Sequence, residues 1–447
     1  MKAQGWVWGL LFCVPVAMAS TLTWSVSGDR ERYTLDGGGD VLSHDGASLT
    51  LHSRPDTTQG NGAGVAVIDA TPYRQQRVRL SGEIGTRDVQ GGAGLWLRAD
   101  AATGMVAFAN SQRVPVSGDA DGALREIEIY VPATADRLLV GPLLTGTGRM
   151  SVTRLRLERA SARSDDSVPP TEIVNDAVRR IRAHALNADR VDWRQAEAEI
   201  ERRMPNVHTA DDAYGVIGSL LRKLQDGHSG LLPPRELQRS ANEGTPSFAP
   251  VVEVRDAVGI VPVPAFEGTD TAAGNAFARE LASAIADRAP EASCGWVVDL
   301  RDNNGGNMWP MLSGLYPLLG DATPGYVRDR EGRQRVWKMV SPGIAGPDLS
   351  AVPVVVVTGA KTASSGEAVA VAFRGRPRTR SVGQPTFGVS TSNQMYTLPG
   401  GAGLNLTTAR FVDRTGRAYG DALVPDEAAP EHEAVARAVA SLAACGR

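Results

Sequence analysis

The chain has 447 residues, 42% of them hydrophobic and 22% charged, and its formal net charge at pH 7 is -3. This length allows two or three domains, and the composition is that of an ordinary soluble globular protein. Acidic residues slightly outnumber basic ones and no basic run stands out, so we expect no nucleic-acid partner.

The N-terminus has the layout of a cleavable secretory signal. Lys2 is followed by an apolar stretch over 6–16 and by small residues over 17–19, the order found in signal peptides. The apolar stretch is short for a membrane span, and no later stretch is long and apolar enough to be one. We therefore expect a signal peptide over 1–19, an exported (periplasmic or secreted) protein and no membrane span in the mature chain. An uncleaved anchor is the alternative.

Residues 20–160 lack helical periodicity and instead alternate apolar and polar side chains, as in 78–84 and 126–130. Gly- and Asp-rich turns separate these stretches, which predicts an antiparallel β-sandwich. The stretch from Val67 to the Gly91-Gly92 turn resembles jelly-roll modules of galactose-binding or carbohydrate-binding type. That resemblance implies an all-β jelly-roll domain with a glycan or surface ligand, although such modules also serve as spacers.

A polar segment at 161–170 is a plausible linker, and beyond it the pattern changes. Apolar residues recur at helical spacing over 174–185 and 213–224, which predicts a helical subdomain over 171–235. The remaining residues, 236–447, predict an α/β part. We expect buried strands at 295–300 and 353–358. We also expect a helix at 273–287 and a hairpin over 394–412.

Two cysteines remain after removal of the signal, Cys294 and Cys445. In an oxidising compartment such a pair favours a disulfide, and two buried thiols are the alternative. Neither has a His or acidic neighbour at ligand spacing, so we expect no metal site and no cofactor.

Three segments combine reactive groups with small-residue turns. His228 follows a predicted helix in the sequence Asp-Gly-His-Ser, and Gly227 suits the left-handed position just past a helix end. Gly305-Gly306 follow the predicted strand at 295–300 and precede a helix, where backbone N–H groups can face a developing negative charge. Each segment alone is also compatible with an ordinary turn.

Ser364 lies between the predicted strand at 353–358 and a helical run over 368–373. A serine on a strand-to-helix turn is the arrangement of a nucleophile elbow. Ser364 and Glu367 also form a Ser-x-x-Glu capping box, which requires no catalysis. The two interpretations are compatible, because a helix N-terminus also suits an attacking oxygen.

Together these segments resemble the tail-specific and C-terminal processing serine protease family, including its tricorn-core-like branch. The resemblance runs from about residue 171 to 426 and includes Asp-Leu-Arg-x-Asn-x-Gly-Gly at 299–306. It continues through Gly-Gln-Pro-Thr-Phe-Gly at 383–388, Leu-Thr-Thr-Ala-Arg-Phe at 406–411 and Val-Pro-Asp at 424–426. It implies a core of the ClpP and crotonase type, serine-peptidase activity and peptide or protein substrates.

The resemblance places the nucleophile at Ser364. One branch takes its base from a lysine directly after Phe-Gly, but that position is Val389 here, and valine cannot accept a proton. The other branch uses a histidine, which corresponds to His228 and has a pKa suited to a base. Lys361 is a rival base.

The remaining roles also follow from the resemblance. Gly305 or Gly306 and Ser365 match the oxyanion-hole donors. The residue that orients the histidine is less clear, because the glutamate expected near Pro-Asp is missing; Asp421 is the candidate, and Asp226 and Ser229 are weaker ones.

Two departures leave other functions open. The missing lysine and glutamate allow an inactive binding protein on the same fold, and the sandwich allows a protein that mainly binds glycan or another surface. The interval 233–291 is too short for a PDZ module, so recognition of a C-terminal tail by that route is not expected.

Overall fold

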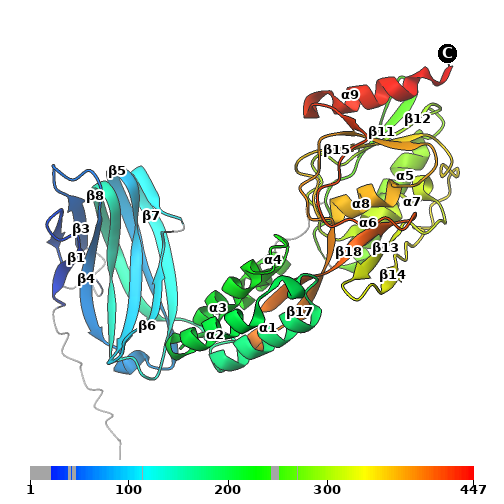
Figure 1. Cartoon of the computed structure of the whole chain (residues 1–447). Helices are drawn as coiled ribbons and strands as arrows, with labels where there is room; N and C mark the ends of the chain where they lie inside the picture. Colours follow the sequence, from blue (N-terminus) through cyan, green and yellow to red (C-terminus); the bar gives the residue numbers. More distant parts are fainter. Residues whose placement is uncertain are drawn as a thin grey trace, which may run out of the picture. The chain divides into compact units, whose positions relative to one another are not determined.

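The computed structural model describes residues 22–38, 42, 47–112, 114–242, 251–268 and 270–446. The chain divides into two compact units, one ending at Asp166 and one beginning at Ser167 (Figure 1). This division lies within the predicted linker at 161–170. The predicted signal peptide at 1–19 lies outside the described residues, and none of the helices described could cross a membrane.

The first unit is built almost entirely of antiparallel strands, which confirms the predicted β-rich N-terminal domain. Its strands are β1 (Trp24–Gly28), β2 (Tyr33–Gly37), β3 (Ser48–Ser53), β4 (Asn61–Asp69), β5 (Gln76–Ala101), β6 (Gly104–Asn110), β7 (Val116–Val131) and β8 (Arg137–Arg159), with a short 3-10 helix at Thr71–Tyr73. Five strands follow the order β1-β4-β8-β3-β2, while β5 pairs with β6, β7 and β8. Alternate side chains such as Leu80 and Ile84 are fully buried, as the period-2 pattern predicts.

The second unit opens with helices that cover one end of a β-hairpin. They are α1 (Pro170–His184), α2 (Trp193–Arg203), α3 (Ala210–Arg222) and α4 (Pro234–Asn242), with 3-10 turns at Ala188–Arg190 and Met204–Asn206. A capping box between Thr209 and Asp212 begins α3, and its apolar face packs with Leu404 and Leu406 of the hairpin. The predicted boundary after residue 235 falls inside α4.

A mainly parallel sheet forms the centre of this unit. Its order is β10 (Glu253–Arg255), β11 (Val258–Pro262), β12 (Gly295–Asp299), β15 (Val354–Thr358), β16 (Thr379–Gly383) and β19 (Glu427–Ala428), parallel from β11 onward. Strands β12 and β15 occupy the predicted apolar runs, and their buried side chains form the core. The helices α5 (Thr271–Arg288), α6 (Met308–Gly314), α7 (Tyr316–Leu319) and α8 (Ser365–Phe373) contribute to that core.

A second, five-stranded sheet connects the helices to this core. It has the order β14 (Gln334–Val336), β13 (Gly325–Asp329), β18 (Gly403–Asp413) and β17 (Thr391–Thr397), and β9 (Gly230–Leu232) also pairs with β18. The hairpin turn is the 3-10 segment Pro399–Gly401. Strand β18 pairs with β13 at its C-terminal end and with β9 at its N-terminal end, and this brings the segment after His228 to the hairpin.

A disulfide joins Cys294 to Cys445, with 5.4 Å between the two Cα atoms, so the disulfide alternative is correct. Cys294 precedes β12, and Cys445 lies in the terminal 3-10 turn (Ala443–Gly446) after helix α9 (Glu431–Leu442). Because α9 packs Ala434 and Ala438 against the sheet, the bond fixes the C-terminus to the core.

Candidate active site

The chemically interesting segments follow the carboxyl ends of adjacent parallel strands. The Gly-Gly turn follows β12, the serine elbow follows β15, and residues 384–391 follow β16. Strands that run parallel end at the same edge of the sheet, which is where α/β proteins place their ligand sites. An active site is therefore expected at this edge of the sheet.

Ser364 has a strained backbone, with φ 51° and ψ -115°, immediately before α8. A non-glycine residue in such a conformation costs on the order of 1–3 kcal/mol and persists only where its surroundings hold it. The strain directs the serine out of a sharp strand-to-helix turn, as the elbow prediction requires. The side chain of Ser364 is partly exposed.

Glu367 is fully buried and holds this elbow. Its Oε2 accepts the N–H groups of Ser364 and Val389, both at 2.9 Å. Its Oε1 accepts the Thr386 hydroxyl at 2.5 Å and the Gly388 N–H at 3.1 Å. Burial raises the pKa of Glu367 above its ordinary value, and these hydrogen bonds act in the opposite direction. The carboxylate thus ties the elbow to the segment after β16.

The Gly-Gly turn lies directly against the elbow. Gly305 and Gly306 have φ values of 116° and 90°, which favour glycine. A Cβ at Gly305 would lie 3.0 Å from the Ser364 Cβ and 3.2 Å from the Ser365 nitrogen. The Gly305 N–H donates to Asn303 Oδ1 at 3.0 Å and is therefore occupied. Of the two glycines predicted as oxyanion donors, Gly306 is the one whose N–H has no partner among the described residues.

His228 is presented by a turn rather than by a helix cap. Helix α3 ends at Arg222, and both Gln225 and Gly227 are left-handed, with φ 52° and 61°. The expectation that Gly227 directly follows the helix was therefore wrong, because the turn is longer. Asp226 Oδ1 accepts the His228 N–H at 3.1 Å, and Asn393 donates to the His228 carbonyl at 3.1 Å. These bonds fix the backbone of the histidine.

The imidazole of His228 forms its hydrogen bond with Thr391, with Nδ1 2.8 Å from Oγ1. Asp421, the predicted orienting residue, is exposed, and its backbone carbonyl accepts the Ser390 hydroxyl at 2.6 Å. Among the described residues, the hydrogen-bond partner of the ring is Thr391 and not Asp421. Burial lowers the pKa of His228 below its ordinary value, and the Asp226 carboxylate opposes this shift.

A continuous series of hydrogen bonds connects the histidine to the serine. The Thr391 N–H donates to the Val389 carbonyl at 2.7 Å, and the Val389 N–H donates to Glu367, which also binds the N–H of Ser364. A pocket of about 410 Å³ is lined by Asp226, Val389, Thr391 and Asp421, together with Leu186, Asn187, Arg190, Gln225, Gly227, Phe387, Gly388, Thr407, Arg410 and Gly420. Neither Ser364 nor His228 lines this pocket, and no hydrogen bond joins their side chains in the part of the chain that the structure describes. The link between the two residues runs through Thr391, Val389 and Glu367.

Lys361, the rival base, forms an ion pair with Asp302 at 3.0 Å, and both side chains are largely exposed. This contact raises the pKa of Lys361, which makes it a poorer base at neutral pH.

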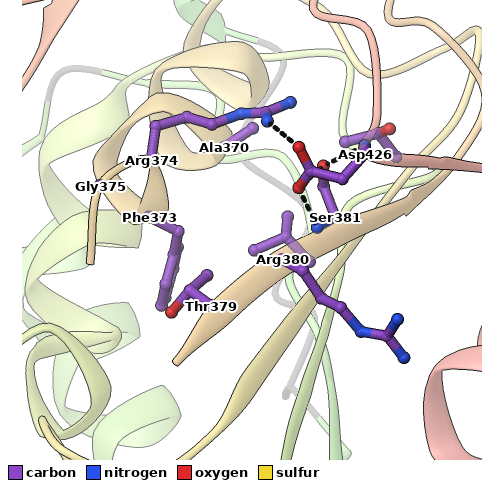
Figure 2. A pocket seen from close by; sticks show the side chains of 10 residues that line it. Ala370, Phe373, Arg374, Gly375, Thr379, Arg380, Ser381 and Asp426 are labelled. Atoms are coloured by element: carbon purple, nitrogen blue, oxygen red, sulfur yellow. Dashed lines mark hydrogen bonds and ion pairs between the residues drawn. The ribbon is translucent and has the colours of Figure 1, made fainter. Parts of the chain in front are cut away.

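A smaller cavity of about 140 Å³ lies beside α8 and β16, and Figure 2 shows the side chains that line it. Asp426 binds Arg374 at 3.0 Å and accepts both the N–H and the hydroxyl of Ser381, at 2.7 and 2.8 Å. Neither Ser364 nor His228 lines this cavity. The Val-Pro-Asp segment at 424–426 therefore anchors the chain between β16 and α8.

Sequence reasoning missed two residues of this site. Thr391 meets His228 only through the folded hairpin, so no local spacing reveals the pair. Asn303 belongs to the Asp-Leu-Arg-x-Asn-x-Gly-Gly pattern, and its position two residues before Gly305 could have indicated a side chain that caps the turn.

Residues 257–428 match the family model of peptidase family S41. The nisin-resistance protein of Lactococcus lactis subsp. lactis is 25% identical over 264 residues, which cover 56% of this chain and 81% of that protein. A carboxyl-terminal-processing protease of Synechocystis is 31% identical over 137 residues. The matched part spans only 31% of that protease.

Among solved structures, a lipoprotein from Streptococcus agalactiae has a TM-score of 0.55 at 23% identity, covering 62% of this chain and 98% of that one. This similarity is one of fold. The photosystem II D1 C-terminal processing protease has a TM-score of 0.46 at 15% identity and covers 60% of this chain and 97% of that one.

Proposed function

This chain belongs to peptidase family S41 and is a serine peptidase, and from this premise we propose that it hydrolyses peptide bonds through an acyl-enzyme on Ser364 with His228 as the base. The observation that carries the proposal is the Ser364 backbone, which is held in a strained elbow by a buried carboxylate. The Gly306 and Ser365 N–H groups next to that elbow are the proposed oxyanion donors.

The environment of His228 suits a base. Because burial lowers its pKa, the imidazole is neutral near pH 7 and can accept a proton. We assign the ring proton to Nδ1. The Thr391 hydroxyl also lies 3.5 Å from the Val389 carbonyl, where it can place its own hydrogen and so accept from Nδ1. This leaves the Nε2 lone pair for the hydroxyl of Ser364.

In the proposed reaction Ser364 Oγ attacks the peptide carbonyl while His228 takes its proton. The negative charge that develops on the carbonyl oxygen is met by the two N–H groups. His228 then passes the proton to the leaving amine, and a water deprotonated by the same ring cleaves the acyl-enzyme. Val389, at the lysine position of the related branch, is almost fully buried and takes no part in proton transfer.

A fluorophosphonate probe, which phosphonylates activated serines, tests this mechanism on the full chain. We expect wild-type protein to be labelled and Ser364→Ala and His228→Ala to be unlabelled. His432→Ala, which removes an exposed histidine on α9, should label like wild type. An unlabelled but folded wild-type protein would refute the enzyme assignment and favour an inactive binding protein on this fold.

The substrate is proposed to be a peptide or protein outside the cytoplasm, and the name of the Lactococcus lactis relative, nisin-resistance protein, gives one compound to test. Export rests on the signal-like N-terminus and on the disulfide, because such bonds persist in oxidising compartments. Mass mapping of the mature N-terminus tests the export proposal, and retention of residues 1–19 in a cytoplasmic protein would refute it.

The N-terminal unit is proposed to be a jelly-roll module that holds the enzyme at a glycan surface. Cross-strand pairing aligns Val67 with Leu139, Leu139 with Arg98, and Arg98 with Phe108, so one row crosses four strands. Val67 and Phe108 are 54% and 48% exposed, although isolated exposed apolar residues are common. Full-length Ser364→Ala protein should sediment with insoluble cell-wall glycan, and adding Phe108→Ala should weaken this; equal sedimentation would refute the proposal for this face.

A further inference from the structure

The oxyanion hole is assembled from two separate chain segments. The Gly306 N–H comes from the turn after β12, and the Ser365 N–H comes from the first residue of α8. Preorganised donors stabilise a transition state only if both point at the same oxygen. Gly305 and Gly306 both have positive φ, and glycine has the greatest backbone freedom of all residues. The Gly306 N–H therefore needs something to fix its direction.

The peptide groups on both sides of that N–H are held. On the N-terminal side, the Gly305 N–H donates to Asn303 Oδ1 at 3.0 Å. On the C-terminal side, the Asn307 N–H donates to the Phe266 carbonyl at 2.7 Å. The Gly306 carbonyl, in the same peptide plane as the Asn307 N–H, accepts the hydroxyl of Ser365 at 2.5 Å. The peptide group that carries the Gly306 N–H therefore lies between two peptide groups whose orientations are fixed by hydrogen bonds.

From this geometry we infer that Ser365 is a positioning residue. Its hydroxyl binds the Gly306 carbonyl and so orients the Gly306 N–H in the proposed oxyanion hole. Ser365 supplies one donor through its own N–H and aligns the other through its side chain. It is 8% exposed, so water competes little for the Gly306 carbonyl. A second tie, from the Ala363 N–H to the Asn303 carbonyl at 3.0 Å, joins the same two segments but leaves the Gly306 peptide untouched. Ser365 is thus the side chain that links elbow and Gly306 directly.

This inference rests on the proposed function, and the test separates the two. Inactivation by a fluorophosphonate is followed at several probe concentrations, which gives the maximal rate and the half-saturating concentration separately. The phosphoryl oxygen of this probe occupies the oxyanion hole in the transition state. Ser365→Ala should lower the maximal rate by about tenfold to a hundredfold and leave the half-saturating concentration within about twofold, because only transition-state contacts are lost.

Two further variants make the result specific. Ser365→Thr retains a hydroxyl and should recover most of the lost rate. Ser381→Ala removes a similarly buried hydroxyl, one that binds Asp426 beside β16, and should label like wild type. Thermal unfolding of each variant is measured in parallel, and we expect Ser365→Ala to unfold within a few degrees of the Ser381→Ala control.

The outcomes are distinct. If wild-type protein does not react, the proposed function fails and the inference fails with it. If wild type reacts and Ser365→Ala reacts at the same maximal rate, only the positioning role is overturned. If Ser365→Ala labels more slowly only because less of it is folded, the hydroxyl is a general structural contact. That outcome also overturns the inference.

Discussion

Glu367→Gln tests whether one buried carboxylate maintains the active-site geometry. Each carboxylate oxygen of Glu367 accepts two hydrogen bonds. Oε2 binds the N–H groups of Ser364 and Val389, and Oε1 binds the Thr386 hydroxyl and the Gly388 N–H. Glutamine presents N–H donors at one of these two oxygen positions, so at least one N–H of the site loses its acceptor. An orphaned buried donor costs about 1–3 kcal/mol, and the remaining bonds lose their ionic character, so we expect a loss of about 2–4 kcal/mol.

Such a loss should lower the unfolding midpoint of the peptidase unit by roughly 4–12 °C. Fluorophosphonate labelling should slow by about tenfold or more even where the protein is fully folded, because displacement of the elbow disturbs the attack geometry. Glu433→Gln is the matched control. Glu433 is 44% exposed and pairs with Arg437 on α9, so its loss should cost at most about 1 kcal/mol. If Glu367→Gln unfolds and labels like this control, the assignment of Glu367 as the support of the elbow is wrong.

Three further predictions follow from the histidine and the disulfide. Thr391→Val should slow labelling by about tenfold to a hundredfold because the ring loses its Nδ1 partner, whereas Asp421→Asn should have little effect; the reverse order would restore Asp421 as the orienting residue. The labelling rate should fall on acidification only below pH ~6.5, the ordinary pKa of histidine, because burial lowers the pKa of His228. In Asp226→Asn, loss of the charge that raises this pKa should move this fall to still lower pH, and an upward shift would contradict the assignment. Reduction of the Cys294–Cys445 bond, which spans 151 residues, should cost about 2–5 kcal/mol, seen as faster amide exchange in α9; unchanged exchange would show that packing alone holds the helix.

Local sequence patterns predicted the elements that position the site, because those elements depend on nearby residues. The apolar runs at 295–300 and 353–358 must be buried, and β12 and β15 occupy them. The elbow at Ser364 was predictable because a strand, a small-residue turn and a helix follow each other directly in the chain. Prediction failed at the end of α3, where Leu224 fits the helical pattern and is fully buried, yet the helix stops at Arg222. Burial continued past the helix because the turn itself packs into the core.

Contacts between distant segments could not be predicted in the same way. Asp421 was chosen because it stands near a position where a glutamate was expected. The residue is exposed, and its backbone carbonyl accepts the hydroxyl of Ser390. Thr391 reaches His228 because β9 pairs with β18, and β18 pairs with β17. Register across three strands decides that contact, and a single sequence does not specify such register.

Val389 supports the backbone of this site through its main chain alone. Its N–H binds Glu367 and its carbonyl accepts from the Thr391 N–H, so both structural roles of the position belong to the main chain. The side chain is 7% exposed and apolar. An ammonium in its place would have to be desolvated, and its charge would need a partner. With valine there, the proposed mechanism needs a proton acceptor from another segment. In the proposed mechanism His228 is that acceptor, and its ring forms a hydrogen bond with Thr391, two residues beyond Val389.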